Sequence, residues 1–274
     1  VRGLAPLERL QRALARRSHV DRGPVSAEGV PAEVRPLVSS INELLARLDR
    51  ALTLQERFVA DAAHQLKTPV AALRTQLDVA LRERDPARLR EGVEAALPGL
   101  ERLSRLASQL LTLARNEPDA AATVRFAPTD LDALGLEVAT QWVPEALKRG
   151  IDLGFEGAGA PVLVQADAAR LRELLDNLLD NAVRYSREGG RITVRVNAAP
   201  APVLEVSDDG PSIPPEERER VFERFHRLLG TSRDGSGLGL AIAREIARLH
   251  GARIALGDDA DGVGNTFSVA FPAR

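Results

Sequence analysis

The chain carries the sequence LLDNLLDNAVRY at residues 174–185, and this stretch decides how its second half folds. Its apolar residues recur in the i, i+3, i+4 pattern of a helix with one buried face. Asn177, Asn181 and Arg184 are spaced four and three residues apart, so they fall on one stripe of that helix. Because the two asparagines are framed by core positions, we interpret the stripe as a binding surface and not as a solvated helix face.

Two further segments supply groups that complement this stripe. Residues 208–213 read DDGPSI and follow a β-like run, which places Asp208 at the end of a strand. A carboxylate there can accept a hydrogen bond from the exocyclic amine of adenine. Residues 235–240 read GSGLGL and open a helix, where backbone amides and the helix start favour a phosphate. The three segments together predict an ATP site, with Mg²⁺ held by the amide oxygens of Asn181 and Asn177.

A histidine upstream is a candidate phosphate acceptor. His64 lies in the helical stretch 58–69, one residue off the apolar seam, so its ring is expected at the edge of a bundle and open to solvent. A neutral imidazole nitrogen is a good nucleophile near neutral pH. Pro69 lacks an amide proton and is expected to loosen or bend the helix nearby. An isolated exposed histidine most often has no role, but the downstream ATP site favours a functional one.

The order and spacing of these motifs resemble the sensor histidine kinases of two-component signalling, over nearly the whole chain. The resemblance implies an α+β fold class: a helical HAMP-like segment and a dimeric four-helix-bundle hairpin, followed by an α/β sandwich ATP-binding domain. It divides the chain into signal-relay helices at 1–57, a dimerisation and histidine phosphotransfer hairpin at 58–117, a linker at 118–123 and the ATP-binding domain at 124–274.

The resemblance also assigns roles to single residues. It implies that His64 accepts the phosphate beside Gln65, and that Thr68 positions a water for removing phosphate from a response regulator. It places Arg184 against a phosphate and Tyr185 against the base. The nucleotide-binding positions that it implies are Asn177, Asn181, Arg184, Tyr185, Asp208, Gly210, Ile213, Gly235, Gly237, Leu238, Gly239, Leu240 and Thr266. Residues 226–234 would form a mobile lid.

Two positions depart from the family pattern. The family usually has an acid after the histidine, whereas this chain has Gln65, which can accept a hydrogen bond but cannot take up a proton. We therefore expect slower self-phosphorylation. The family has a second glycine where this chain has Ser212, which is tolerated unless the backbone there requires a positive φ.

Composition limits the partners. With 37 basic and 39 acidic residues the net charge is -2, which gives no electrostatic case for nucleic acid. The chain has no Cys, which excludes thiolate metal sites and suits a reducing compartment. It starts at Val1 and contains no Met, so we expect a soluble fragment whose membrane sensor precedes it. The resemblance implies that the full-length protein works at the cytoplasmic face of the inner membrane.

Periodicity predicts helices in the first half and mixed structure in the second. Heptad seams run over 34–52, 59–81 and 89–114, and a hairpin with one wet apolar stripe predicts a homodimer. Strands are expected at 191–196, 203–207, 254–256 and 266–271. Helices are expected at 131–149, 167–184, 215–224 and 238–250.

These observations favour an ATP-dependent protein-histidine kinase that phosphorylates His64 and passes the phosphate to an aspartate of a response regulator, with regulator phosphatase activity as well. Two alternatives remain open at this stage. Gln65 is compatible with a phosphatase-biased kinase, and the chain could instead be a nucleotide-responsive dimeric scaffold.

Overall fold

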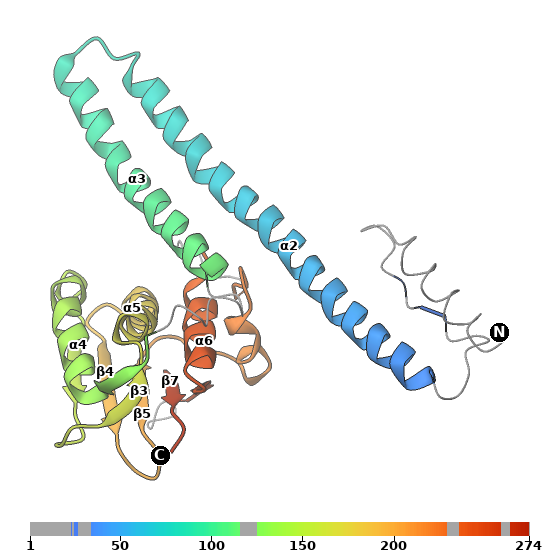
Figure 1. The fold of residues 1–274 in the computed structure, drawn as a ribbon. Helices are drawn as coiled ribbons and strands as arrows, with labels where there is room; N and C mark the ends of the chain where they lie inside the picture. The colour runs from blue at the N-terminus through green and yellow to red at the C-terminus, as the bar shows by residue number, and fades with distance from the viewer. Residues whose placement is uncertain are drawn as a thin grey trace. The chain divides into compact units, whose positions relative to one another are not determined.

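The computed structural model describes residues 23, 25–26, 34–115, 125–228, 236–258 and 264–273. The predicted linker 118–123, residues 229–234 of the predicted lid, and Gly235 lie outside these residues. The chain divides into two compact units, Val1–His64 and Gln65–Arg274, and Figure 1 identifies their elements. In the parts of the chain that the structure describes, no helix combines the length and the apolar character that a bilayer crossing requires.

The described part of the first unit centres on the start of helix α2 (Arg35–Ala80). Val38 is buried there against Val25. Partly buried apolar residues flank this pair, namely Val34, Ile41 and Leu45. Asn42 ties the segment around Val25 to the helix, because its amide accepts a hydrogen bond from the Val25 N–H (2.7 Å) and donates one to the Val25 carbonyl (3.0 Å). The first heptad seam therefore packs against an upstream stretch of the chain.

Helix α2 continues through the predicted boundary between residues 57 and 58 and through Pro69. The missing amide proton of Pro69 removes one backbone hydrogen bond without ending the helix. Helix α3 (Pro86–Arg115) follows after a short turn. Asp85 begins it, because its carboxylate accepts a hydrogen bond from the Ala87 N–H (3.0 Å).

The hairpin keeps much of its apolar stripe in solvent. Gly99 allows α3 to approach α2 closely, since a Cβ at that position would lie 2.7 Å from Cδ2 of Leu73. Large apolar residues on both helices nevertheless remain exposed, among them Val70, Leu77, Val79, Val93, Leu97 and Leu100. A single chain therefore leaves this stripe uncovered, as expected for a helix hairpin on its own.

The remainder of the second unit is a layered α/β domain. Its main sheet has the strand order β2-β4-β5-β7-β6, and β1 and β3 form a separate antiparallel pair. The strands are β1 (Ala127–Asp130), β2 (Asp152–Glu156), β3 (Leu163–Ala166), β4 (Arg191–Asn197), β5 (Val203–Asp208), β6 (Arg253–Gly257) and β7 (Asn265–Ala270). The helices are α4 (Leu131–Leu147), α5 (Ala168–Tyr185) and α6 (Gly239–Leu249).

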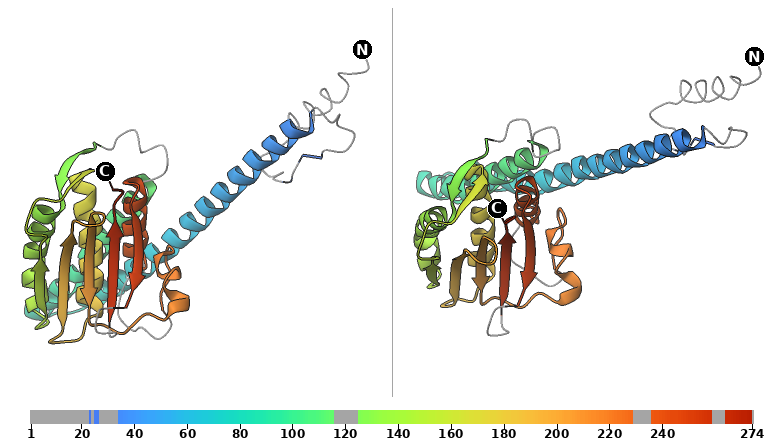
Figure 2. Two further views of the ribbon diagram at one scale, coloured as in Figure 1. Left: turned by 90° about the horizontal axis from the view of Figure 1, so that it is seen from below. Right: turned by 60° about the horizontal axis from the view of Figure 1, so that its bottom comes forward.

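Burial explains this arrangement. Figure 2 shows α4, α5 and α6 side by side on one face of the main sheet. In β4 every second residue is buried, with Ile192, Val194 and Val196 on the helix side. The strand β2 pairs in parallel with β4, and the other neighbours pair antiparallel. One apolar layer between sheet and helices thus holds the domain together.

Four predicted strands are confirmed as β4 to β7, and three predicted helices as α4 to α6, with small shifts of their ends. The predicted helix 215–224 is wrong. It is two single turns, η2 (Pro215–Glu217) and η3 (Arg220–Phe222), because the chain becomes extended at Glu223 and adopts a φ of 63° at Phe225. The strands β1 to β3 were not predicted.

Candidate functional site

Helix α5 carries the asparagine stripe. Asp167 caps its first turn by accepting hydrogen bonds from the N–H groups of Ala169 and Arg170 (3.1 and 3.2 Å). Seven of its residues are buried in the core, namely Leu171, Leu174, Leu175, Leu178, Leu179, Ala182 and Val183. Asn177 and Asn181 lie on the remaining face and are half-buried. The helix is therefore anchored by its apolar side and presents its amides beside the core.

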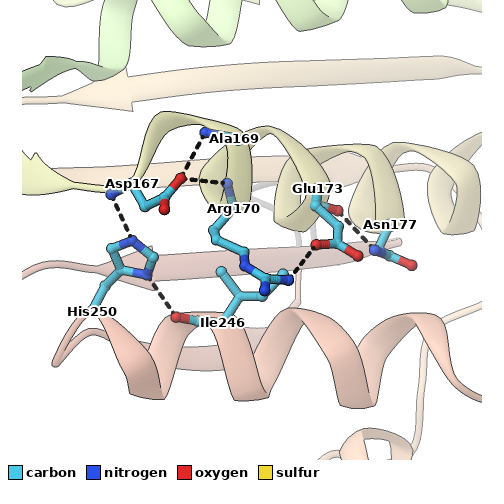
Figure 3. Close-up of polar contacts among 7 residues, drawn as sticks. All are labelled: Asp167, Ala169, Arg170, Glu173, Asn177, Ile246 and His250. Atoms are coloured by element: carbon cyan, nitrogen blue, oxygen red, sulfur yellow. Dashed lines mark hydrogen bonds and ion pairs between the residues drawn. The ribbon is translucent and has the colours of Figure 1, made fainter. Parts of the chain in front are cut away.

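The orientation of Asn177 is set by its neighbours, as Figure 3 shows. Its Nδ2 donates a hydrogen bond to the carbonyl of Glu173 (2.7 Å). Its Oδ1 therefore faces the first turn of α6, where a Cβ added at Gly239 would lie 3.1 Å away. The side chain of Glu173 is in turn paired with Arg170 (3.2 Å). The structure thus brings the asparagine stripe and the glycine segment together.

Asp208 ends strand β5 and is only 2% exposed. Its Oδ1 accepts hydrogen bonds from the Gly210 N–H (2.9 Å) and from Nδ2 of Asn265 (3.1 Å). A Cβ at Gly210 would lie 2.6 Å from this oxygen and 2.9 Å from the carbonyl of Tyr185. Only glycine fits at this position, and its turn brings Asp208 beside the end of α5.

Asn265 is a structural residue of the site that sequence reasoning missed. Its Oδ1 accepts a hydrogen bond from the N–H of Ile213 (2.9 Å), and its Nδ2 also donates to the carbonyl of Pro211 (3.0 Å). Asn265 is buried on the same face of β7 as Phe267. A polar residue at an inward position of the strand pattern is the signal that would have identified it.

The serine in place of the second family glycine is accommodated. Ser212 is not among the residues with positive φ. Its hydroxyl accepts a hydrogen bond from the N–H of Gly264 (3.1 Å), which joins the turn to the start of β7. The backbone of the turn after Asp208 therefore does not require a glycine at position 212.

The glycine segment begins helix α6. Gly237 has a φ of 68°, and a Cβ there would lie 2.8 Å from the backbone of Phe225. The Phe225 N–H donates a hydrogen bond to the carbonyl of Gly237 (2.8 Å). Leu238 is fully buried, and Leu240 is half-buried in the first turn. The segment is thus held close to the end of the η3 region, with the first-turn amides of α6 beside Asn177.

Two of the predicted nucleotide contacts, Arg184 and Thr266, have protein partners. Arg184 pairs with Asp180 (2.7 Å) on its own helix. Thr266 shares a hydrogen bond between hydroxyl groups with Ser207 (2.8 Å) on the neighbouring strand. Tyr185 is half-buried at the end of α5. The roles of Arg184, Tyr185 and Thr266 toward a nucleotide stay predictions.

The candidate acceptor region lies on α2. His64 and Thr68 are exposed, and Gln65 between them is half-buried. The exposed ring of His64 agrees with its position off the apolar seam. Among the described residues, no group of three His, Cys, Asp or Glu side chains is arranged to hold a metal ion.

Comparison with known proteins relates these parts to described families. Residues 166–274 match the histidine kinase-, DNA gyrase B- and HSP90-like ATPase family. Residues 54–119 match the His Kinase A (phospho-acceptor) domain, and residues 4–50 match the HAMP domain of the PhoQ-like sensor proteins. An ATPase-type α/β domain thus follows a phosphoacceptor helix pair and a HAMP segment.

The similar proteins are sensor kinases. The sensor protein kinase PmrB of Pseudomonas aeruginosa is 39% identical over 273 residues, which cover 99% of this chain and 57% of PmrB. The sensor protein QseC of Escherichia coli is 39% identical over 263 residues, which cover 95% of this chain and 58% of QseC. The chain therefore spans somewhat more than half the length of these relatives.

A solved structure shares the fold. The histidine kinase ThkA in complex with the response regulator protein TrrA matches with a TM-score of 0.67 and 24% identity, over 82% of this chain and 64% of that one. The three matched domain families and the similar proteins all point to the same class of protein. The chain belongs to the sensor histidine kinases.

Proposed function

We propose that the chain transfers the γ-phosphate of ATP to His64 and then passes it to an aspartate of a response regulator receiver domain. The observation that carries this proposal is the convergence of three separate segments around α5. Gly239 adjoins Asn177, and Gly210 adjoins the backbone of Tyr185 beside Asp208. Glycines at which a Cβ would collide leave room for a ligand to approach the backbone. Adenine at Asp208 and phosphates at the start of α6 suit these groups.

The proposed reaction is an in-line phosphoryl transfer. An imidazole nitrogen of His64 attacks the γ-phosphorus, an N–P bond forms, the P–O bond to the β-phosphate breaks, and ADP leaves. The ring proton leaves the attacking imidazole for solvent or a neighbouring base. Asn181 and Asn177 would hold Mg²⁺, which neutralises charge on the phosphates when bound. The half-buried amide of Gln65 would orient the imidazole, and Arg184 would contact a phosphate.

Partners follow from the same proposal. A second copy of the chain would cover the exposed apolar stripe of α2 and α3, which makes a four-helix bundle. The bounds 1–57, 58–117, 118–123 and 124–274 would separate signal relay, phosphotransfer hairpin, linker and ATP-binding domain. Signals would enter through the HAMP segment from a membrane sensor, and a response regulator would accept the phosphate near His64. Thr68 would position a water that hydrolyses the aspartyl phosphate of the regulator and releases inorganic phosphate.

A phosphatase-biased balance is the second candidate, and Gln65 favours it. An amide beside the acceptor cannot take up the imidazole proton, which slows the forward step and leaves Thr68 unaffected. Regulator dephosphorylation that exceeds autophosphorylation in rate would support this balance.

The test is incubation with γ-labelled ATP and Mg²⁺, with His64→Ala and Asn181→Ala as variants. The proposal expects label that is labile in acid and stable in base, and that disappears in both variants. Acid-stable label, or label that persists in His64→Ala, would reject His64 as the acceptor. ATP binding without any label would favour the scaffold reading.

A further inference from the structure

One carboxylate of the ATP-binding domain is shared by two arginines from different helices. Arg184, one turn further along α5, places Nη2 2.7 Å from Oδ2 of Asp180. Arg105 of α3 places Nη1 3.8 Å from Oδ1 of the same side chain. The two guanidinium groups approach different oxygens of Asp180, and their like charges repel each other, so each arginine weakens the pairing of the other.

Helix α3 also contacts the glycine segment. Gln109 lies one turn after Arg105, and its Oε1 accepts a hydrogen bond from the Ser236 hydroxyl (2.9 Å). The same hydroxyl accepts a hydrogen bond from the Leu238 N–H (3.3 Å). A cavity of about 640 Å³ opens among α3, α4 and α5, and Arg105, Gln109, Asn177 and Arg184 are part of its lining. Two successive turns of α3 thus reach both segments that the proposed function assigns to phosphate.

We propose that nucleotide binding transfers Asp180 from Arg184 to Arg105. This inference rests on the proposed function, in which Arg184 contacts a phosphate. When the phosphate draws Arg184 away, Asp180 is left to Arg105, and α3 is held more firmly on the ATP-binding domain. Conversely, when Asp180 pairs with Arg105, its ion pair with Arg184 weakens and Arg184 can contact the phosphate. Arg105 and Asp180 are therefore positioning residues that couple nucleotide binding to docking of the hairpin.

Linkage makes this coupling measurable. If nucleotide strengthens the Arg105–Asp180 pair, the pair must strengthen nucleotide binding by the same factor. Calorimetric titration of the full chain with a non-hydrolysable ATP analogue and Mg²⁺ would compare the wild type, Arg105→Gln, Asp180→Asn and the double variant. We expect Arg105→Gln to weaken the affinity about two- to fivefold, which is the size of a solvent-exposed ion pair. In the Asp180→Asn background the same change should have no effect.

Arg90 offers a matched control. It lies on the same helix and pairs only locally with Glu94 (2.8 Å), so Arg90→Gln removes an equal charge from α3 and should leave the affinity unchanged. Trp142, the only Trp of the chain, donates a hydrogen bond to Asp176 (2.8 Å) and lines the cavity. Its emission should shift on nucleotide binding in the wild type and shift less in Arg105→Gln.

The outcomes separate the inference from the function on which it rests. An equal loss of affinity from Arg105→Gln in both backgrounds, or no loss in either, overturns the transfer while nucleotide binding by the wild type stands. A wild type that binds no nucleotide overturns the proposed function and this inference with it. The transfer is supported if Arg105→Gln lowers nucleotide affinity in the wild-type background alone and Arg90→Gln leaves the affinity unchanged.

Discussion

Asn265 and Asp208 lie opposite each other on β7 and β5, and the Asn265 amide donates a hydrogen bond to the Asp208 carboxylate (3.1 Å). The same amide also holds the carbonyl of Pro211 and the N–H of Ile213. One buried side chain therefore orients the carboxylate and closes the turn that follows it. The candidate adenine contact is built by a strand neighbour that lies far away in the sequence.

Removing this amide should cost stability. Asn265→Ala removes three hydrogen bonds, to Asp208, Pro211 and Ile213, and we expect the free energy of unfolding to fall by about 1–3 kcal/mol or more. Urea unfolding measures it. Asn197→Ala is the control, since Asn197 lies on β4 of the same sheet with a single amide contact, to Glu205 (3.2 Å), and should lose much less. An equal fall in the free energy of unfolding of the two variants would mean that the three Asn265 hydrogen bonds add no stability beyond that of a single amide contact.

Asp208→Asn should impair ATP binding while the fold survives. The amide oxygen can keep the hydrogen bonds from Gly210 and Asn265, but an NH₂ group then replaces the second carboxylate oxygen and repels the adenine amine. We expect affinity for ATP to drop about 10- to 100-fold, as for the loss of a hydrogen bond to a charged group. Titration calorimetry measures the affinity of the variant for ATP, and GTP, which lacks the adenine amine, serves as the comparison ligand. Asp152→Asn, at an exposed site on β2, should bind ATP normally, and unchanged binding in Asp208→Asn would refute the adenine contact.

Gly237→Ala should disturb the glycine segment. At a φ of 68° an added Cβ would meet the Phe225 backbone at 2.8 Å, so we expect about 1–3 kcal/mol of strain together with weaker nucleotide binding. Thermal unfolding and calorimetry measure the two effects. At Gly257 on β6 nothing lies within 4 Å of an added Cβ, so Gly257→Ala should change stability by no more than about 0.5 kcal/mol. If Gly237→Ala and Gly257→Ala change stability and nucleotide affinity equally, the close approach of Gly237 to the Phe225 backbone does not constrain the glycine segment.

His250 should make the domain sensitive to acid. Burial lowers the pKa of His250. Its Nε2 accepts a hydrogen bond from the Asp167 N–H (3.0 Å), and its Nδ1 donates to the Ile246 carbonyl (2.8 Å), as Figure 3 shows. The neutral ring is therefore the folded form.

The unfolded chain takes up this proton at the ordinary histidine pKa of about 6.5, whereas the folded chain takes it up only at lower pH. The contribution of His250 is complete above about pH 6.5 and is lost as the pH falls through the lowered pKa. Urea unfolding at several pH values should show a smaller loss of stability on acidification in His250→Gln. The same loss in variant and wild type would show that another group titrates.

Gln65→Glu should accelerate autophosphorylation. A carboxylate beside His64 can take up the proton that the imidazole releases, and we expect an increase of about 100-fold, at the lower end of general-base effects. Initial rates with γ-labelled ATP measure it. Gln76→Glu adds the same charge at an exposed position of α2 and should leave the rate unchanged. An unaltered rate in Gln65→Glu would mean that proton transfer is not limiting.

The sequence predicts those features that local periodicity determines. The helix of Asn177 and the end-of-strand position of Asp208 each follow from fewer than twenty consecutive residues, and both appear as expected. The resemblance then grouped these segments, and the close approach of Gly239 to Asn177 is consistent with that grouping.

Features that depend on distant contacts were missed. The hydrogen bond from Asn265 to Asp208 spans 57 residues, so no local pattern reveals it. The strand β2 contains Gly154 and is defined by its parallel pairing with β4. Residues 215–224 have helical composition, but burial of Phe222 and the reversal at Phe225 override it. Tertiary packing decides all three cases.

The most direct test of the central claim is to locate the phosphate after reaction of the full chain with ATP and Mg²⁺. Peptide mapping by mass spectrometry, kept at alkaline pH to preserve an N–P bond, would assign the modified residue. We predict phosphate on His64 in the wild type, and about 10- to 100-fold less on His64 in Asp208→Asn after the same short reaction time, at an ATP concentration well below the wild-type dissociation constant. Phosphate on another residue, or on His64 to the same extent in Asp208→Asn, would contradict the account.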